Sequence, residues 1–256
     1  MADHLPGCPL ERPFAIDVAP NGRMLLLDHE GKRLCTGQPG EPPSCGTLHV
    51  RAKSAALLES HILLLEEGAK LHTLHPGGAP IGAVTIRRRA SALAVAPSGS
   101  VLVGYSPEGF VEHGVLVERL GSAPLTWSDP TFDGVTALAA DSGGVWVVHG
   151  ERALRLRPVP GAFEAAQAVT LPAAARAATI GPDGALFVLL EPGDSLVRVF
   201  GTEVDAPTAL PDVLLDIAGG GGRLWGCGEP GLVELTELVP PPEAGGRLGP
   251  PPACAS

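Results

Sequence analysis

A short strand–turn–strand pattern recurs about every 40 residues, and it restricts the fold more than any other feature of this sequence. Each copy has an apolar stretch, a turn that usually carries glycine, and a second apolar stretch. Repeats of short strands at this period are typical of β-propellers, in which each repeat forms one blade. The turns are marked by Gly22, Ser60, Gly99, Gly143, Gly184 and Gly222, which are 38, 39, 44, 41 and 38 residues apart.

A second marker keeps the same period. Each unit has a later turn in which an acidic residue lies close to a glycine. These acidic residues are Glu30, Glu67, Glu108, Glu151, Asp194 and Glu229. Because two independent markers share one period, we predict an all-β, six-bladed β-propeller of four-stranded antiparallel blades. The blades are expected to begin near residues 14, 54, 91, 135, 176 and 213.

The repeat pattern also predicts the domain limits. We expect residues 1–239 to form the propeller, and residues 240–256, which are rich in proline and glycine, to form a flexible C-terminal tail. The sixth unit is short of one strand. The segment before Pro13 is available to supply that outer strand and so to close the ring.

Charge and composition exclude several classes of partner. The formal net charge is −10, whereas proteins that bind nucleic acid need a positive surface, so no nucleic-acid partner is expected. No apolar run approaches the roughly 18 residues of a membrane span, and the N-terminus does not have the pattern of a signal peptide. We therefore expect a monomeric, cytoplasmic protein, and its preference for arginine over lysine suggests a bacterial source.

The five cysteines do not have the spacing of a zinc site, because no C-x-x-C pair occurs. Free thiols are expected in a reducing compartment. Cys35 and Cys45 flank a loop rich in glycine and proline, and they could face each other across a hairpin. The sequence leaves both states open for this pair.

The turn after three of the predicted inner strands carries a family resemblance. It reads Ala19-Pro20-Asn21-Gly22 in the first unit, and related turns occur within residues 93–103 and 178–189. This turn resembles those of the NHL-repeat and regucalcin/gluconolactonase group of propellers. For the gluconolactonase-like enzymes, the resemblance implies a divalent cation near the central channel, held by carboxylates and an asparagine, which polarises a carbonyl or activates water. The single asparagine here, Asn21, lies in a turn.

Two aspartates are the candidate metal ligands. Asp17 in Ile-Asp-Val-Ala and Asp216 in Leu-Asp-Ile-Ala have matching sequence surroundings, and their units become neighbours when the ring closes. We expect the two carboxylates at the same depth, one blade apart. They could bind a divalent cation through oxygen, or each could accept hydrogen bonds from nearby backbone groups.

The predicted function follows from the acidic turns, since no complete catalytic motif is present. In a four-stranded meander, the turn between the second and third strands shares a face with the blade connections. The six acidic residues are therefore expected around one channel mouth, where they favour a basic protein surface or peptide, although arginines and lysines of the blade connections partly neutralise them. Trp127, in a predicted loop over residues 122–133, is a candidate anchor for that partner. The prediction is a non-catalytic binding module, with a metal-dependent, lactonase-like hydrolase as the alternative and ordinary solvated turns as the simplest explanation.

Overall fold

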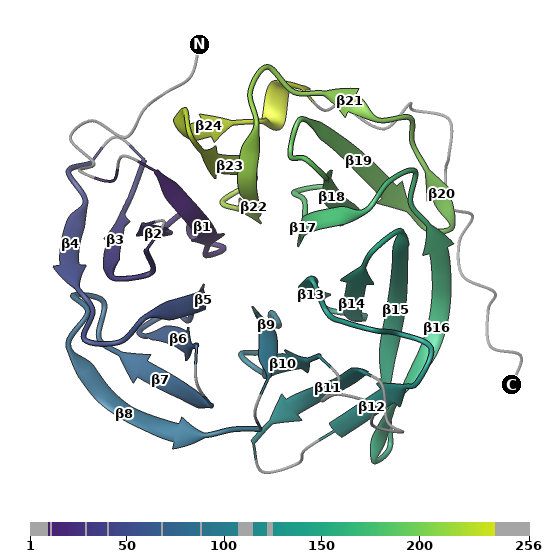
Figure 1. Cartoon of the computed structure of the whole chain (residues 1–256), viewed down its shortest axis with the longest axis horizontal. Helices are drawn as coiled ribbons and strands as arrows, with labels where there is room; N and C mark the ends of the chain where they lie inside the picture. Colours follow the sequence, from purple (N-terminus) through teal and green to yellow (C-terminus); the bar gives the residue numbers. More distant parts are fainter. Residues whose placement is uncertain are drawn as a thin grey trace, which may run out of the picture.

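The computed structural model describes residues 10, 12–28, 30–39, 41–67, 69–87, 89–106, 115–121 and 125–238. Six small antiparallel sheets are arranged as a ring around a central axis (Figure 1). The predicted six-bladed β-propeller is thus confirmed. Helix is almost absent from the described residues, which contain a single 3-10 turn, η1 (Thr236–Leu238). Within them no helix has the length and apolar character needed to cross a membrane.

Each blade is a meander in which consecutive strands pair, except that in blade 5 the two short outer strands β20 and β21 both pair with β19. Blade 1 holds β1 (Pro13–Val18), β2 (Met24–Asp28), β3 (Arg33–Gly37) and β4 (Ser44–Thr47); blade 2 holds β5 (Ala52–Leu57), β6 (Ile62–Glu66), β7 (Lys70–Leu74) and β8 (Pro80–Thr85); blade 3 holds β9 (Ala90–Val95), β10 (Val101–Tyr105), β11 (Val115–Leu120) and β12 (Leu125–Asp129). Blade 4 holds β13 (Ala137–Asp141), β14 (Gly144–His149), β15 (Arg152–Val159) and β16 (Ala162–Thr170); blade 5 holds β17 (Ala175–Ile180), β18 (Leu186–Leu190), β19 (Ser195–Phe200), β20 (Glu203–Val204) and β21 (Thr208–Ala209); blade 6 holds β22 (Leu214–Gly220), β23 (Arg223–Gly228) and β24 (Gly231–Glu234).

The innermost strands β1, β5, β9, β13, β17 and β22 surround the axis (Figure 1). Each begins within two residues of its predicted start. The second strands are nearly continuous apolar runs, such as the Leu-Phe-Val-Leu-Leu of β18, which is buried along its whole length. A strand in this position is covered on both sides by neighbouring blades, and burial on both sides requires such a run instead of alternation.

Turn chemistry explains the glycine marker. In blades 1, 3 and 5 the first hairpin closes with a Pro-x-Gly turn, and Gly22, Gly99 and Gly184 have φ angles of 82°, 79° and 79°. In each turn the glycine N–H donates to the carbonyl oxygen three residues earlier. Proline favours the first central position of a type I turn, and glycine accepts the left-handed conformation that follows. The positive φ angles expected at these three glycines are confirmed.

Six apolar clusters form the core, one between each pair of neighbouring blades. The cluster between blades 6 and 1 closes the ring, with Ile16 and Val18 packed against Trp225. Leu10 is also buried there. Among the described residues, blade 6 has three strands. The predicted closing strand before Pro13 and the predicted tail over residues 240–256 lie outside the described residues, Leu10 and Arg12 excepted.

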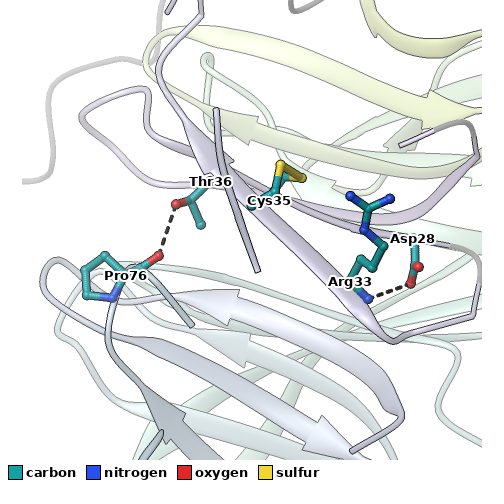
Figure 2. The surroundings of a disulfide bond; sticks show 6 residues. Asp28, Arg33, Cys35, Thr36 and Pro76 are labelled. Atoms are coloured by element: carbon teal, nitrogen blue, oxygen red, sulfur yellow. Dashed lines mark hydrogen bonds between the residues drawn. A yellow bond between two sulfur atoms is a disulfide. The ribbon is translucent and has the colours of Figure 1, made fainter. Parts of the chain in front are cut away.

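Cys35 and Cys45 form a disulfide bond. They are direct cross-strand partners on β3 and β4, so of the two states that the sequence leaves open the structure has the bridge. Figure 2 shows its surroundings, where the Thr36 hydroxyl donates to the carbonyl oxygen of Pro76 in blade 2 at 3.1 Å. The disulfide thus joins the two outer strands of blade 1, and the hydrogen bond joins this part of blade 1 to blade 2.

Candidate functional site

A central cavity of about 890 Å³ runs along the propeller axis, lined by the innermost strands of all six blades. One mouth lies at the first hairpin turns. The other lies on the face that bears the turns between second and third strands together with the blade connections, which we call the connector face. Small apolar residues make up much of the wall, so its few polar side chains stand out as candidates for function.

Asp17 and Asp216 both line the cavity, and both bridge neighbouring blades. Asp17 accepts hydrogen bonds from Val18 N at 2.9 Å and, across the blade boundary, from Leu57 N at 2.6 Å. Asp216 accepts from Ile217 N at 2.9 Å and, across the boundary between blades 6 and 1, from Ile16 N at 3.0 Å. Each carboxylate therefore fixes the backbone of the next blade.

The two aspartates do not lie at the same depth, and this part of the prediction is wrong. Asp17 is two residues from Ala19, where blade 1 enters its three-residue turn. Asp216 is four residues from Gly220, where blade 6 enters a two-residue turn. The local sequences are similar, but the turns that follow differ in length. The two aspartates are therefore offset by two residues along the strand, which corresponds to roughly 7 Å. The residue of blade 6 level with Asp17 is Ala218.

Burial raises the pKa of both carboxyls. The pKa of Asp17 rises to about 6, because the side chain is largely removed from water while two backbone N–H groups oppose the shift. The pKa of Asp216 rises to about 7 for the same reason, and the neighbouring Asp17 carboxylate adds to the shift. No group of three or more His, Cys, Asp or Glu side chains suited to hold a metal ion occurs among the described residues. A divalent cation at Asp17 and Asp216 stays a prediction that metal titration can test.

The mouth on the connector face is shaped by β-bulges. In five blades the pairing between the first two strands shifts by one residue near the start of the innermost strand. The residues inside these irregularities are Phe14, Lys53, Ser91, Arg176 and Leu215, and all five line the cavity. A bulge redirects a side chain that regular pairing would hold on one face of the sheet. Sequence reasoning missed this ring, because a one-residue bulge leaves no periodic signal.

The two cations of the ring also connect blades. Lys53 Nζ donates to the carbonyl oxygen of Ala90 in blade 3 at 3.3 Å. Arg176 Nε donates to the carbonyl oxygen of Leu215 in blade 6 at 3.3 Å, and its Nη1 pairs with Glu191 at 3.0 Å. Blades 2 and 5 are opposite in a six-membered ring, so the two cations lie on opposite sides of this mouth.

Blade 4 has regular pairing here and carries a hydrogen-bonded chain of three side chains instead. The Thr136 hydroxyl lies 2.9 Å from His149 Nδ1, and His149 Nε2 lies 3.0 Å from Asp133 Oδ1. Thr136 lines the cavity at the position that corresponds to the bulged residues. A Cβ atom on Gly134 would collide with the imidazole ring, so glycine makes room for the histidine. No sequence motif indicated this group, because it forms only where the connection into β13 packs against the end of β14.

The acidic turns that the structure describes lie where the sequence predicted them. Five of the six residues are described, and all five are exposed in turns between second and third strands; Glu108 lies outside the described residues. Glu30 pairs loosely with Lys32 at 3.5 Å, and Glu67 with Arg51 at 3.7 Å. Exposed ion pairs of this kind contribute little stability and are easily exchanged for another partner.

The charge is unevenly distributed around the connector face. Blades 1–3 place Lys32, Arg51, Lys53, Arg87 and Arg89 on this face, which offsets their acidic turns. In blades 4–6, the described turns, connections and adjoining strand ends carry six acidic residues against two arginines, Arg152 and Arg176. The six are Asp133, Glu151, Glu191, Asp194, Asp212 and Glu229. Among the described residues, the negative charge of the connector face is therefore concentrated on blades 4–6.

Trp127 lies on strand β12 and not in the predicted loop, so that assignment is wrong. It pairs with Val117, and its half-buried ring meets the edge of Phe132 with ring centroids 6.1 Å apart. The polar residues around it pointed to a loop, but they alternate with Leu125 and Trp127 as in a strand with one covered face. A role for Trp127 in partner binding stays a prediction.

No protein-family model matches the chain, and no curated protein sequence matches it. Solved structures do match. The gluconolactonase XC5397 from Xanthomonas campestris is 14% identical with a TM-score of 0.66, covering 91% of this chain and 86% of that one. Regucalcin, a calcium-binding protein from Agrobacterium tumefaciens, is 12% identical with a TM-score of 0.64, covering 88% and 85%. Virginiamycin B lyase from Staphylococcus aureus is 15% identical with a TM-score of 0.61, covering 88% and 81%. At these identities the likeness establishes the fold, and the predicted resemblance to propellers of the regucalcin and gluconolactonase kind is confirmed at that level.

Proposed function

We propose that the protein is a binding module that docks a basic protein surface or peptide on the acidic half of its connector face. The observation that carries the proposal is the uneven charge of that face. On blades 4–6 the described residues include six exposed carboxylates and only two arginines. Like charges grouped on a rigid surface focus a negative potential, which speeds association with a cationic partner and makes binding sensitive to salt.

The chemistry of the channel supports this choice. Asp17, Asp216, Lys53 and Arg176 each bond to the backbone of the next blade. These bonds use part of the hydrogen-bonding capacity of the four charged groups and give them a structural role in joining the blades. The described carboxylates of the turns make no hydrogen bond to the backbone of a neighbouring blade among the described residues. Three of them, Glu151, Asp194 and Glu229, also make no ion pair there.

Charge reversal tests the proposal with a matched control. Glu151, Asp194 and Glu229 are replaced together by Lys, and binding to fluorescent peptides rich in lysine and arginine is measured by anisotropy at low and high salt. We expect wild-type binding to weaken with salt and to be lost in this variant. The control carries Lys at three exposed acidic residues of the opposite face, Glu41, Glu59 and Glu203, so its net charge changes equally. Equal loss in both variants, or none in either, would refute the proposed face.

A metal-dependent, lactonase-like hydrolase is the second candidate. It is favoured by the likeness to a calcium-binding protein and to a gluconolactonase among the solved structures and by the two carboxylates in the channel. A cation would have to bind the remaining lone pairs of the Asp17 and Asp216 carboxylates, beside the backbone hydrogen bonds that they accept. A calcium-dependent rise in melting temperature would support this candidate.

A further inference from the structure

We propose that Thr136, His149 and Asp133 form a hydrolytic site at the channel mouth, which cleaves small carboxylic esters without a metal ion. Thr136 is the nucleophile, His149 is the general base and Asp133 orients the imidazole. This activity goes beyond the proposed docking of a basic partner and does not depend on it.

The geometry has the form of an activated nucleophile. Such a group requires a hydroxyl and a base within about 2.6–3.2 Å, and a third side chain that holds the base in place. Both distances, 2.9 Å and 3.0 Å, are within that range. A carboxylate only accepts hydrogen bonds, so in the neutral imidazole the proton is on Nε2, facing Asp133. Nδ1 is then the acceptor of the Thr136 hydroxyl proton, as a general base must be.

The surroundings provide access and a stabilising charge. Thr136 lines the central cavity, whose volume of about 890 Å³ admits a small ester. Arg176 lines the same cavity at the corresponding position of the next blade. Its Nε and Nη1 are held by Leu215, Glu191 and Pro192, and its Nη2 makes no hydrogen bond with a described residue. A fixed guanidinium at this mouth can stabilise the negative oxygen that develops during acyl transfer.

The reaction balances with water as the second substrate. The Thr136 oxygen attacks the ester carbonyl carbon while its proton passes to His149 Nδ1. The tetrahedral intermediate collapses, the carbon–oxygen bond to the alcohol breaks, and the alcohol leaves with the proton from His149. Water, deprotonated by His149, then attacks the Thr136 ester and releases the carboxylic acid, and the hydroxyl regains its proton.

Hydrolysis of p-nitrophenyl acetate tests the site. We expect wild-type protein to hydrolyse it faster than buffer, and Thr136→Val and His149→Gln each to lower the rate above buffer by about 100-fold or more. Thr136→Ser retains the hydroxyl and should retain activity. His61→Gln is the matched control, because His61 lines the cavity at the opposite mouth, and it should leave the rate unchanged.

Covalent labelling keeps the proposal testable even if a variant does not fold. Wild-type protein treated with a fluorophosphonate should carry the adduct on the peptide that contains Thr136, as identified by mass spectrometry. Hydrolysis no faster than buffer, an unaffected rate in Thr136→Val with a native melting curve, or an adduct confined to other residues would overturn the assignment. None of these results would affect the docking proposal, which is measured by peptide binding alone.

Discussion

Replacing Asp216 with Asn tests whether an inter-blade carboxyl controls how stability depends on pH. Burial raises its pKa from 3.8 to about 7 in the folded protein. In the unfolded chain the carboxyl ionises near its ordinary pKa, whereas in the folded protein it keeps its proton to about pH 7. The folded state thus binds the proton more tightly. The stabilisation is complete below about pH 4 and is lost as the pH rises through about 7.

The size of the effect follows from the shift. A difference of roughly 3 pH units at 1.36 kcal/mol each corresponds to about 4 kcal/mol, an upper limit because the side chain is partly exposed to the channel. Between about pH 4 and 6.5 the free energy of unfolding should fall by up to about 1.4 kcal/mol per pH unit from this group. Asn does not titrate, and it can accept only one of the hydrogen bonds from Ile16 and Ile217, which costs about 1–3 kcal/mol at every pH.

Urea unfolding of wild type and Asp216→Asn at several pH values separates the pH-dependent contribution of the carboxyl from the pH-independent cost of the lost hydrogen bond. We expect the variant to be clearly less stable near pH 4.5 and to approach or exceed wild-type stability near pH 8. Asp194→Asn is the control, because Asp194 is exposed in a turn and its variant should follow wild type throughout. A constant difference between Asp216→Asn and wild type across the whole range would refute the reasoning.

Three further predictions concern turns, the disulfide and cations. Gly184→Val should lower the free energy of unfolding by about 1–2 kcal/mol, because φ is 79° at this position. Gly77→Val is the control and should change the urea midpoint little, because Gly77 has no positive φ and a Cβ atom there would meet no other atom. Cys45→Ala removes a cross-link between residues 10 apart in the chain and should cost about 3 kcal/mol; denaturation unchanged by the substitution would contradict a stabilising bridge. If the channel carboxylates bind a divalent cation, calcium or zinc should raise the melting temperature of wild type and not of Asp216→Ala; a wild-type curve indifferent to both would remove the metal hypothesis.

The sequence by itself determined the fold, because a propeller repeats one local unit. Every blade must place a strand, a tight turn and a second strand at the same intervals, so the turn residues recur at the period of the fold. Gly22, Gly99 and Gly184 could be identified because a left-handed turn excludes most other residues. The acidic turns were identified in the same way, since a turn between second and third strands keeps its place in each repeat.

Only the tertiary structure decided which side chains meet across blades. Asp17 and Asp216 have matching sequence surroundings, yet turns of unequal length move them two residues apart in depth. Thr136, His149 and Asp133 come together because the connection into β13 packs against the end of β14, a contact with no local sequence pattern. The bulges that direct Lys53 and Arg176 to the channel mouth likewise depend on how neighbouring strands pair. The repeat in the sequence is enough to predict the blades. The side chains that meet at blade boundaries depend on the register of strand pairing, which a one-residue bulge or a longer turn shifts without changing the repeat period.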